Sequence, residues 1–453
     1  MYTKAQFQVA RQSRDPRFDG LFYVAVKSTG IYCRPICPAP TAKEQNVEYY
    51  TYAHQAAQAG FRPCIRCRPD SAPNSYAWQG TATTAHRARQ LIDEGALISN
   101  TTAHLAERLG ISVRHLNGLF SEYFATTPKS YAIYKQCDFA KQLLQQTSLS
   151  ISEIAFACGF ASLRRFNDAF SKLYQLTPSA IRGNRKQHIA TELTLFLPYR
   201  PPYNWRTLQR FLATRAIDSL ETVTENSYAR TFELKNACGY FQAQHNETRH
   251  GFDVTIAINK VEFLHEVVIT IRRLLDLDAD CQVIESTLKQ ALGTEFELVN
   301  GLRLPGICTT FEAGIRAILG QQVSVKAAKN YVQQLVNELG KVTEYGVLFP
   351  APSDVAASDL AFFKMPARRK QAVIALAEYE ASASTNDLTN WLAIKGIGPW
   401  TVQYAQMRGQ SHPDIFLGGD LGVVKALAKC SSFDVADAAP FRSYLTFQLW
   451  NKL

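Results

Sequence analysis

The spacing of hydrophobic residues changes character along the chain. Residues 104–181 show helical periodicity in two successive stretches, and after residue 188 the pattern becomes alternating, as in half-buried strands. The predicted strands are 192–197, 240–244 and 252–258. Helical periodicity then returns, for example in 311–319 and 368–379. We therefore expect a multidomain protein, α+β and mainly α, in which an all-α part precedes a small antiparallel-sheet α+β part and a helical part.

The first helical region contains an internal repeat. The segment HLAERLGISVRHLNGLFSEYFATTPKSY (104–131) is echoed by EIAFACGFASLRRFNDAFSKLYQLTPSAI (153–181), with Gly110 matching Gly159. In each copy a short helix reaches the glycine, turns and enters a second helix, which is the pattern of a double helix-turn-helix. Polar residues of the second helices are candidates for DNA contacts: Arg114, His115, Asn117, Arg164, Arg165 and Asn167. The plain alternative is a helical bundle with a solvated basic face.

Changes in composition suggest joints between domains. The stretches RPDSAPNS (68–75) and RGNRKQH (182–188) lack periodicity, whereas VNGLRLPG (299–306) is either a joint or a loop inside a continuous domain. We expect four domains, at 1–75, 80–185, 190–300 and 301–453. A chain of 453 residues is long enough for this, at about 100–200 residues per domain.

Charge and composition narrow the class of protein. Lys and Arg outnumber Asp and Glu by 49 to 39, and this net charge of +10 suits a polyanionic partner such as double-stranded DNA. The longest apolar runs fall short of the roughly 20 residues that cross a bilayer, and residues 1–20 are polar, so we expect a cytoplasmic monomer without membrane contact. Ten cysteines in such a protein indicate metal binding or catalysis rather than disulfides.

Four of these cysteines form two close pairs. Cys33 and Cys37 lie in IYCRPIC, and Cys64 and Cys67 lie in FRPCIRCR. Two short loops that each offer two thiolates predict a tetrahedral zinc site. Spacing alone indicates a structural zinc that holds a small α/β domain together.

The residues around the cysteines add a resemblance. The frames TGIYCRP and GFRPCIRC resemble the N-terminal domain of the Ada family of methyl-phosphotriester repair proteins, and the repeat resembles the AraC-type module that follows it in that family. The resemblance spans residues 1 to about 185. It implies that Cys33 is both zinc ligand and methyl acceptor. The Pro-Cys-His-Arg tetrapeptide of the family's second methyltransferase domain is absent from this sequence. A redox-sensing zinc factor is the other reading of the cluster.

The second half of the chain contains another motif. In IKGIGPWTVQYAQMRG (394–409), Gly396 and Gly398 lack a Cβ, so the backbone before a helix can approach a phosphate closely. Together with DIFLGGDLGV (414–423), PPYNW (201–205) and RAILGQQVSV (316–325), this segment resembles the 3-methyladenine DNA glycosylases of the AlkA type, which have an all-α helix-hairpin-helix domain. The resemblance extends from about residue 191 to the end.

This second resemblance implies roles for single residues. Asp420 would be the catalytic carboxylate, and Gly396 and Gly398 would hold the DNA backbone. The base pocket would be formed by Phe211, Trp400, Tyr404 and Trp450. Trp400 stands where strand-cutting relatives have a lysine, so we expect a monofunctional glycosylase that needs no cofactor.

The sequence also departs from the AlkA pattern. Gly419 replaces a frequent second aspartate, Leu421 replaces a pocket tyrosine, and Gln322 replaces the apolar wedge that fills the gap left by a flipped base. We expect a protein that excises alkylated purines, takes a methyl group on Cys33 and regulates transcription, with RNA polymerase as a candidate partner. The alternative is a regulator whose glycosylase half only binds DNA. The remaining Cys137, Cys158 and Cys238 are predicted to be core residues.

Overall fold

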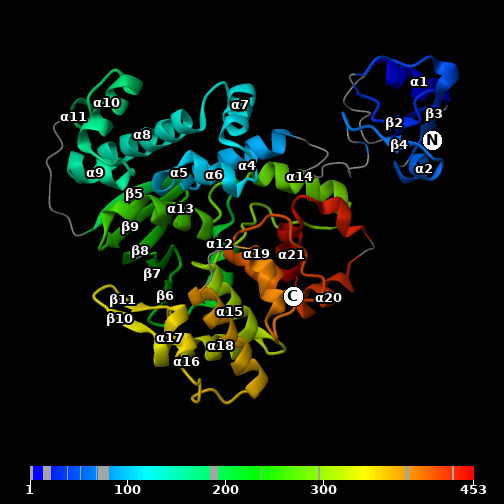
Figure 1. The fold of residues 1–453 in the computed structure, drawn as a ribbon. Coiled ribbons are helices and arrows are strands. Elements are labelled where there is room, and N and C mark those ends of the chain that lie inside the picture. Colours follow the sequence, from blue (N-terminus) through cyan, green and yellow to red (C-terminus); the bar gives the residue numbers. More distant parts are fainter. Residues whose placement is uncertain are drawn as a thin grey trace. The chain divides into compact units, whose positions relative to one another are not determined.

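The computed structural model divides the chain into two compact units, residues 1–132 and 133–453 (Figure 1). The described residues are 4–13, 22–37, 39–51, 53–67, 69, 81–183, 192–235, 237–293, 296–382, 387–430 and 433–452. Most residues of the two proposed joints, at 68–75 and 182–188, lie outside these ranges. The division into four domains is finer than the two units and stays a prediction. Among the described helices, none has both the length and the apolar character required to cross a membrane.

The first unit begins with a small sheet of strand order β3-β1-β2-β4, in which only β2 and β4 pair in parallel. Alternation along β1 places Tyr23 and Ala25 against α2, and Val24 on the opposite face with Phe7 of α1. Each face therefore has only a small core, so this domain needs further stabilisation. The elements are α1 (Lys4–Ser13), β1 (Tyr23–Val26), β2 (Ile31–Cys33), η2 (Glu44–Asn46), β3 (Val47–Tyr50), α2 (Ala53–Gln58) and β4 (Arg62–Pro63).

The first copy of the repeat forms a helical bundle in the same unit. Its helices are α4 (Thr81–Asp93), α5 (Ala96–Ser99), α6 (Thr102–Arg108) and α7 (Val113–Phe124). Thr101 and Ser112 cap α6 and α7, and Gly110 turns the chain between them with a φ of 68°. Leu116 and Phe120 bury the inner face of α7. The predicted helix-turn-helix is confirmed.

The second copy has the same local design in the second unit. A long helix, α8 (Pro128–Gln146), precedes α9 (Ile151–Ala157), α10 (Leu163–Tyr174) and α11 (Pro178–Arg182). Ser150 and Glu153 form a capping box on α9, Ser162 caps α10, and Gly159 makes the turn with a φ of 78°. Ala125 ends α7 and Gln175 ends α10, both in the left-handed conformation, so the repeat extends to the helix ends.

A five-stranded antiparallel sheet follows, in the order β5-β9-β8-β7-β6. All three predicted strands are confirmed, within β5, β8 and β9. The elements are β5 (Leu193–Pro198), α12 (Trp205–Ala213), β6 (Glu221–Val223), β7 (Ser227–Leu234), β8 (Ala237–Asn246), β9 (Gly251–Ile258), η3 (Val261–Phe263), α13 (Leu264–Leu274) and α14 (Cys281–Leu292). At the sheet edge, Gln146 Oε1 accepts from the N–H of Phe196 (2.8 Å) and Gln142 Nε2 donates to its carbonyl (3.1 Å). Helix α8 thereby covers backbone groups that an edge strand leaves unpaired.

The rest of the second unit is helical, as predicted, with one addition. Strands β10 and β11 form an antiparallel hairpin that the sequence pattern did not indicate, because each strand has only three residues. The elements are α15 (Thr310–Gly320), α16 (Val325–Leu339), β10 (Lys341–Thr343), β11 (Gly346–Leu348), α17 (Pro352–Ala356), α18 (Ala367–Ser382), η4 (Leu388–Ala393), α19 (Pro399–Gly409), α20 (Leu421–Leu427), η5 (Val435–Ala438) and α21 (Arg442–Trp450).

The segment 299–306 is a loop inside the second unit. Arg303 is 1% exposed and donates to four backbone carbonyls, those of Asp276, Ala279, Arg200 and Pro202. These four bonds from the two terminal nitrogens of the guanidinium hold the loop against the segment after β5 and the segment between α13 and α14. Of the two interpretations of this segment, the loop within a continuous domain is the one that the structure supports.

The core assignments of three cysteines have different outcomes. Cys137 and Cys158 are fully buried, as predicted. Cys238 is only half-buried, and its Sγ accepts a hydrogen bond from Asn259 Nδ2 (3.3 Å). The prediction for Cys238 was wrong because strand alternation places it on the outer face of β8, between the buried Ala237 and Gly239.

Candidate functional site

The four cysteines of the first unit meet at one point. Cys33 ends β2, Cys37 follows a turn, and Cys64 and Cys67 bracket a turn after β4, which pairs with β2. All four sulfurs lie within 4.8 Å of one another. Cys37, Cys64 and Cys67 are buried, whereas Cys33 is half-buried. The residue expected to take a methyl group is thus the most accessible of the four.

The chemistry of this cluster fits a zinc ion. The hydrogen bond from Cys33 to Cys67 raises the pKa of Cys33, with burial adding to the effect, and the same bond lowers the pKa of Cys67 to about 6. Four thiols so close together cannot all ionise without a cation between them. Four sulfur donors in two close pairs are the set that tetrahedral zinc prefers. The backbone N–H of Arg34 donates to Cys67 Sγ (3.3 Å), a contact that holds one ligand in place.

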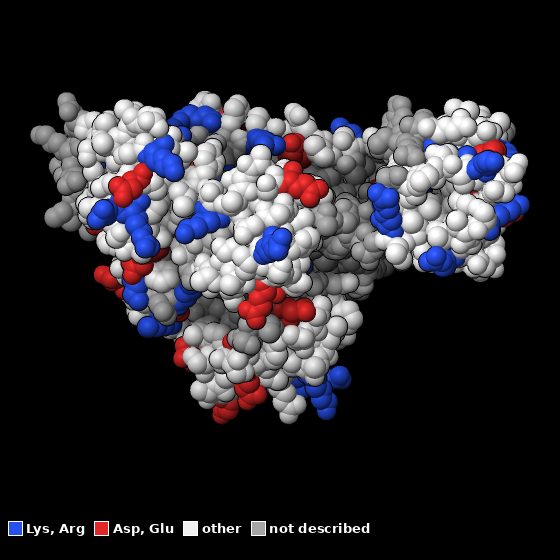
Figure 2. Space-filling view, turned by 45° about the horizontal axis from the view of Figure 1, so that its top comes forward, with Lys and Arg blue, Asp and Glu red and all other residues white. Residues whose placement is uncertain are grey.

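The candidate DNA contacts of the helix-turn-helix copies lie on exposed helix faces. Five of the six residues are exposed, and Asn167 is half-buried. They occupy the first two turns of α7 and α10, the part of a recognition helix that reaches base edges. Figure 2 shows that basic side chains on the face in view form small separate groups with acidic ones between them. DNA contact by these six residues remains a prediction.

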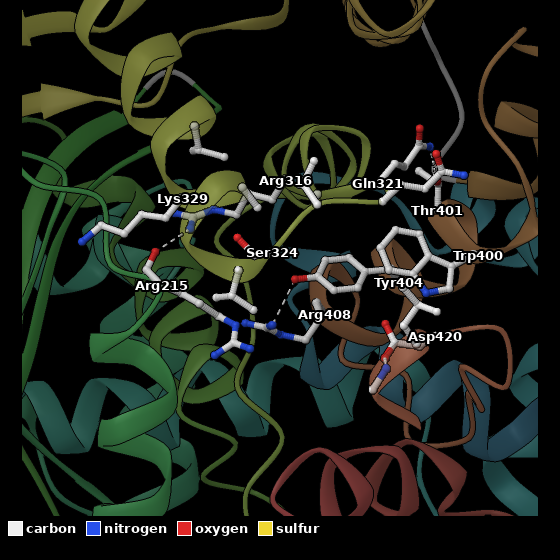
Figure 3. A pocket seen from close by; sticks show the side chains of 18 of the residues that line it. Arg215, Arg316, Gln321, Ser324, Lys329, Trp400, Thr401, Tyr404, Arg408 and Asp420 are labelled. Atoms are coloured by element: carbon white, nitrogen blue, oxygen red, sulfur yellow. Dashed lines mark hydrogen bonds between the residues drawn. The ribbon is translucent and has the colours of Figure 1, made fainter. Parts of the chain in front are cut away.

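The glycosylase candidates gather in one cleft of about 1150 Å³ in the second unit. Phe211 comes from α12, Gln322 from the α15–α16 loop, Gly396 and Gly398 from the turn before α19, and the others from α19, α20 and α21. The full set is Phe211, Gln322, Gly396, Gly398, Trp400, Tyr404, Asp420 and Trp450. Figure 3 shows Trp400, Tyr404 and Asp420 on neighbouring walls of this cleft. The structure therefore brings together every residue that the resemblance named, and their catalytic roles stay predictions.

Asp420 is held by one of its two oxygens. As the N-cap of α20, its Oδ1 accepts from the N–H groups of Gly422 (2.9 Å) and Val423 (3.2 Å). The same oxygen accepts from Trp450 Nε1 (2.9 Å). Among the described residues no hydrogen bond is made to Oδ2. The carboxylate is thus oriented by three donors while one oxygen stays available to the cleft.

Two arginines that were not predicted from the sequence lie against the aromatic residues of the cleft. Arg215 lies over the ring of Phe211, with its Cζ 3.7 Å from the ring centroid, and Arg408 lies 4.8 Å from the same ring. Figure 3 shows their guanidinium groups side by side, below Tyr404. Burial lowers the pKa of Arg215 to about 10, and Arg408 contributes to the decrease. Arg215 follows Phe211 by one helical turn, a spacing that could have revealed it.

A buried ionic network forms part of the cleft lining, with Glu221, Arg230 and Arg316 among the lining residues. Arg316 donates to Glu221 (2.8 Å) and Glu312 (2.9 Å), and Arg230 pairs with Glu312 (2.9 Å). Burial acts to raise the pKa of Glu221, but Arg316 and Arg230 outweigh it and hold the pKa at about 2. Arg316 also donates to the carbonyl of Arg215 (3.3 Å). The network therefore links α15, which carries Arg316 and Glu312, to β6 and β7 of the sheet domain.

The glycines of the turn before α19 have different reasons to be glycine. Gly396 has a φ of +98°, and a Cβ there would lie 2.9 Å from the Cβ of Ala372. Gly398 has no atom within 4 Å of such a Cβ, so the space beside it is open on the protein side. Folding requires the first glycine, whereas the second leaves room for an external partner such as a DNA backbone.

The three departures from the AlkA pattern all line the cleft. Leu421 is 68% exposed, and a Cβ at Gly419 would also meet nothing within 4 Å. Gln322 has a left-handed φ of 55°, unusual for a residue with a side chain. Arg368 and Lys425 are exposed basic residues of the cleft that the sequence did not single out. All five line the cleft and are exposed to solvent.

A cysteine-cluster domain, a pair of helix-turn-helix motifs and a helical domain with a carboxylate-bearing aromatic cleft define a DNA-directed repair and regulatory protein. Three family models match the chain: "Metal binding domain of Ada" over residues 6–70, "Helix-turn-helix domain" over 105–184 and "AlkA N-terminal domain" over 194–309. The zinc, helix-turn-helix and AlkA resemblances drawn from the sequence are thus confirmed.

Individual relatives extend this match to the whole chain. The chain is 33% identical, over 481 residues, to the "Probable bifunctional transcriptional activator/DNA repair enzyme AlkA" of Mycobacterium tuberculosis, covering 98% of this chain and 95% of the relative. It is 33% identical to "DNA-3-methyladenine glycosylase 2" of Escherichia coli, covering 56% of this chain and 95% of the relative. It is 40% identical to the E. coli "Bifunctional transcriptional activator/DNA repair enzyme Ada", covering 26% of this chain and 32% of the relative. The chain belongs to the family of bifunctional transcriptional activator/DNA repair enzymes of the AlkA type.

Proposed function

We propose that the second unit excises alkylated purines from DNA with Asp420 as the catalytic carboxylate. The single observation that supports this most strongly is the assembly of Asp420, with one anchored and one available oxygen, beside the aromatic side chains of Trp400 and Tyr404 in one cleft. Base excision needs the target nucleotide outside the duplex, and the cleft volume of about 1150 Å³ accommodates a purine nucleotide. The names of the relatives agree with this substrate class.

The residues of the cleft suit each part of the reaction. An alkylated purine is positively charged and stacks on electron-rich aromatic faces. When the bond from C1′ to the base nitrogen breaks, its electron pair leaves with the base, and the sugar develops an oxocarbenium-like charge that Asp420 Oδ2 would stabilise. Water then adds at C1′ and gives up a proton to the carboxylate. Because Trp400 occupies the position of the lysine in strand-cutting relatives, the product would be an abasic site in an intact strand.

We infer a second reaction at the cysteine cluster. The thiolate of Cys33 would attack the methyl carbon of a methylphosphotriester, forming a thioether and leaving a phosphodiester anion. A bound zinc ion would supply the positive charge that keeps the four thiols deprotonated. Methylation reduces the formal charge of the four-thiolate site from −2 to −1, so repulsion of the DNA backbone would weaken after repair. Of the four, Cys33 is half-buried, whereas the other three are buried.

The regulatory part of the proposal concerns the two helix-turn-helix motifs. The exposed faces of α7 and α10 would bind double-stranded promoter DNA, and methylation of Cys33 would raise the affinity of the protein for it. RNA polymerase as a partner, a monomeric state and a cytoplasmic location are further predictions from the sequence.

Replacing Asp420 tests the excision proposal. Asp420→Asn keeps an acceptor oxygen for Gly422, Val423 and Trp450, so the fold around α20 should persist. We expect release of 3-methyladenine from methylated DNA to fall by about 10²- to 10³-fold, as when a group that stabilises transition-state charge is removed. Equal release by the wild type and the variant would refute the role of Asp420. No release by either protein would favour the alternative of a regulator whose glycosylase half only binds DNA.

Mass spectrometry of the first unit tests the methyl-transfer proposal. After incubation with DNA that contains methylphosphotriesters, Cys33 should gain one methyl group and the other three cysteines none. A redox-sensing zinc factor would instead lose zinc on oxidation and show no S-methylcysteine.

A further inference from the structure

Gln321 joins three parts of the cleft that are separate in the sequence. It follows α15, and the two hydrogens of its side-chain Nε2 donate to the carbonyl of Gly396 (3.2 Å) and to Thr401 Oγ1 (3.1 Å). Its own carbonyl accepts from Arg369 of α18 (2.8 Å). The α15–α16 loop, helix α18 and the turn before α19 therefore converge on one residue, and Figure 3 shows the Gln321 side chain reaching Thr401.

The two side-chain partners of Gln321, and the residue that follows it, are linked to residues with expected DNA roles. Thr401 is 1% exposed and follows Trp400, which forms a wall of the base pocket. Gly396 is the glycine with positive φ in the turn that would hold the DNA backbone. Gln322, the expected wedge, is the next residue after Gln321 and is exposed at the cleft.

The anchoring of Gln321 accounts for the unusual backbone of Gln322. A non-glycine residue with a φ of 55° costs on the order of 1 kcal/mol or more, and it persists only where its surroundings fix it. The carbonyl bond from Arg369 and the two side-chain bonds fix the residue directly before it. The backbone from which the exposed Gln322 side chain extends is thereby anchored to the turn and to α19.

We propose that Gln321 is a positioning residue for base extrusion, which sets the wedge Gln322 in register with the backbone-holding turn and the base pocket. The inference rests on the proposed excision activity. Extruding a paired base requires the backbone to be held, the gap to be filled and the base to be stacked at the same time. A displacement of about 1 Å in such an arrangement can reduce a rate about 10²-fold. Among the residues that the structure describes, Gln321 is the one whose side chain hydrogen-bonds both to the turn and to α19.

The chemistry of the contact makes the amide specific. Both partners of Nε2 are oxygens, the carbonyl of Gly396 and the hydroxyl of Thr401, so two N–H donors are required. Gln321→Met keeps the length of the side chain and removes both donors. Gln333 offers a matched control, because its Nε2 also donates twice, to the carbonyl of Asp218 (3.1 Å) and to Asn337 (2.9 Å). It does not line the cleft.

The test compares two duplexes with the full-length protein. One contains 7-methylguanine paired with cytosine, and the other contains the same lesion opposite an abasic site, where no pair has to be broken. We expect Gln321→Met to lower single-turnover release from the paired lesion by about 10- to 100-fold. Release from the unpaired lesion should change by less than about 3-fold, within the ordinary spread of a contact that the reaction does not use. Gln333→Met should change neither rate.

Several results would overturn the proposal. Equal losses on both duplexes would mean that Gln321 only supports the pocket, and no loss on the paired lesion would mean that it does not position the wedge. Thr401→Val, which removes one partner from the opposite side, should show the same preference for the unpaired lesion, and its failure to do so would count against the inference even if Gln321→Met folds poorly. If the wild type releases no base from either duplex, the proposed function fails, and the role of Gln321 fails with it.

Discussion

The cysteine cluster and the base cleft represent two ways of building a reactive site. The cluster takes its four residues from two short turns, and its sulfurs lie within 4.8 Å of one another on a domain with two small cores. The cleft takes residues from α12 to α21 and depends on the contact between the sheet domain and the helical domain. The cluster would use up Cys33 in a single turnover, whereas Asp420 would be regenerated.

Because the two sites are built differently, different substitutions should inactivate them. A single lost thiol removes a donor that no neighbour replaces, so the cluster should fail locally and completely. The cleft is supported by a buried network between Arg316, Glu221, Glu312 and Arg230, so it can also fail through its framework. Changes in one site should leave the other intact, because the sites lie in different compact units.

The largest effect is expected from Cys33→Ser. The hydroxyl of serine is a far weaker nucleophile than a thiolate, so methyl transfer should fall below detection while base excision keeps its wild-type rate. Transfer of radiolabelled methyl groups from methylated DNA measures the first activity, and base release measures the second. Cys430→Ser, a half-buried cysteine outside the cluster, serves as the control and should alter neither. A loss of base excision in Cys33→Ser would contradict the prediction that the two sites function independently.

The next largest effect concerns the framework of the cleft. Arg316→Met would leave Glu221 and Glu312 buried without one partner, and a broken buried ion pair typically costs about 3–5 kcal/mol. The free energy of unfolding, from chemical denaturation followed by far-UV circular dichroism, should fall by that amount. Arg249→Met removes an exposed pair with Asp253 and should cost about 0–1 kcal/mol. Similar costs for both variants would show that the network does not support the cleft.

A smaller effect should come from the pocket wall. Trp400→Ala removes a stacking face, which is worth about 1–3 kcal/mol per base, so excision should slow by about 10- to 100-fold. Trp400→Phe keeps an aromatic face and should lose less. Equal losses in the two variants, measured as single-turnover base release, would argue against stacking at this position.

The smallest expected effect is a change in how stability depends on pH under acid conditions. The folded-state pKa of Glu221 is about 2, below its ordinary value of 4.5, so its ionised form stabilises the fold fully above pH 4.5. That contribution is lost as the pH falls from about 4.5 to about 2. Denaturation curves across this window should show a smaller loss of stability with acid for Glu221→Gln than for the wild type. Parallel curves would mean that Glu221 is not held ionised by its arginines.

Much of the local structure could be predicted from the sequence. Helix-turn-helix spacing and the strands that correspond to β5, β8 and β9 follow from patterns of short range, as do the paired cysteines. The two misjudged features, Cys238 and the β10–β11 hairpin, depend on which face of a strand is covered and on a turn between strands of three residues. Strands of three residues are too short to show alternation, and the alternation of β8 does not by itself tell which of its faces is covered.

Sequence by itself determined the zinc ligands, because two close pairs of thiols can meet around one ion with little help from the rest of the chain. It also determined the candidate residues of the cleft, but only through resemblance. Tertiary structure alone decided that Arg316 joins Glu221 to Glu312, and that Gln321 bonds to Gly396 and Thr401. The physical reason is that these contacts join residues far apart in the sequence, whose meeting depends on the packing of whole domains.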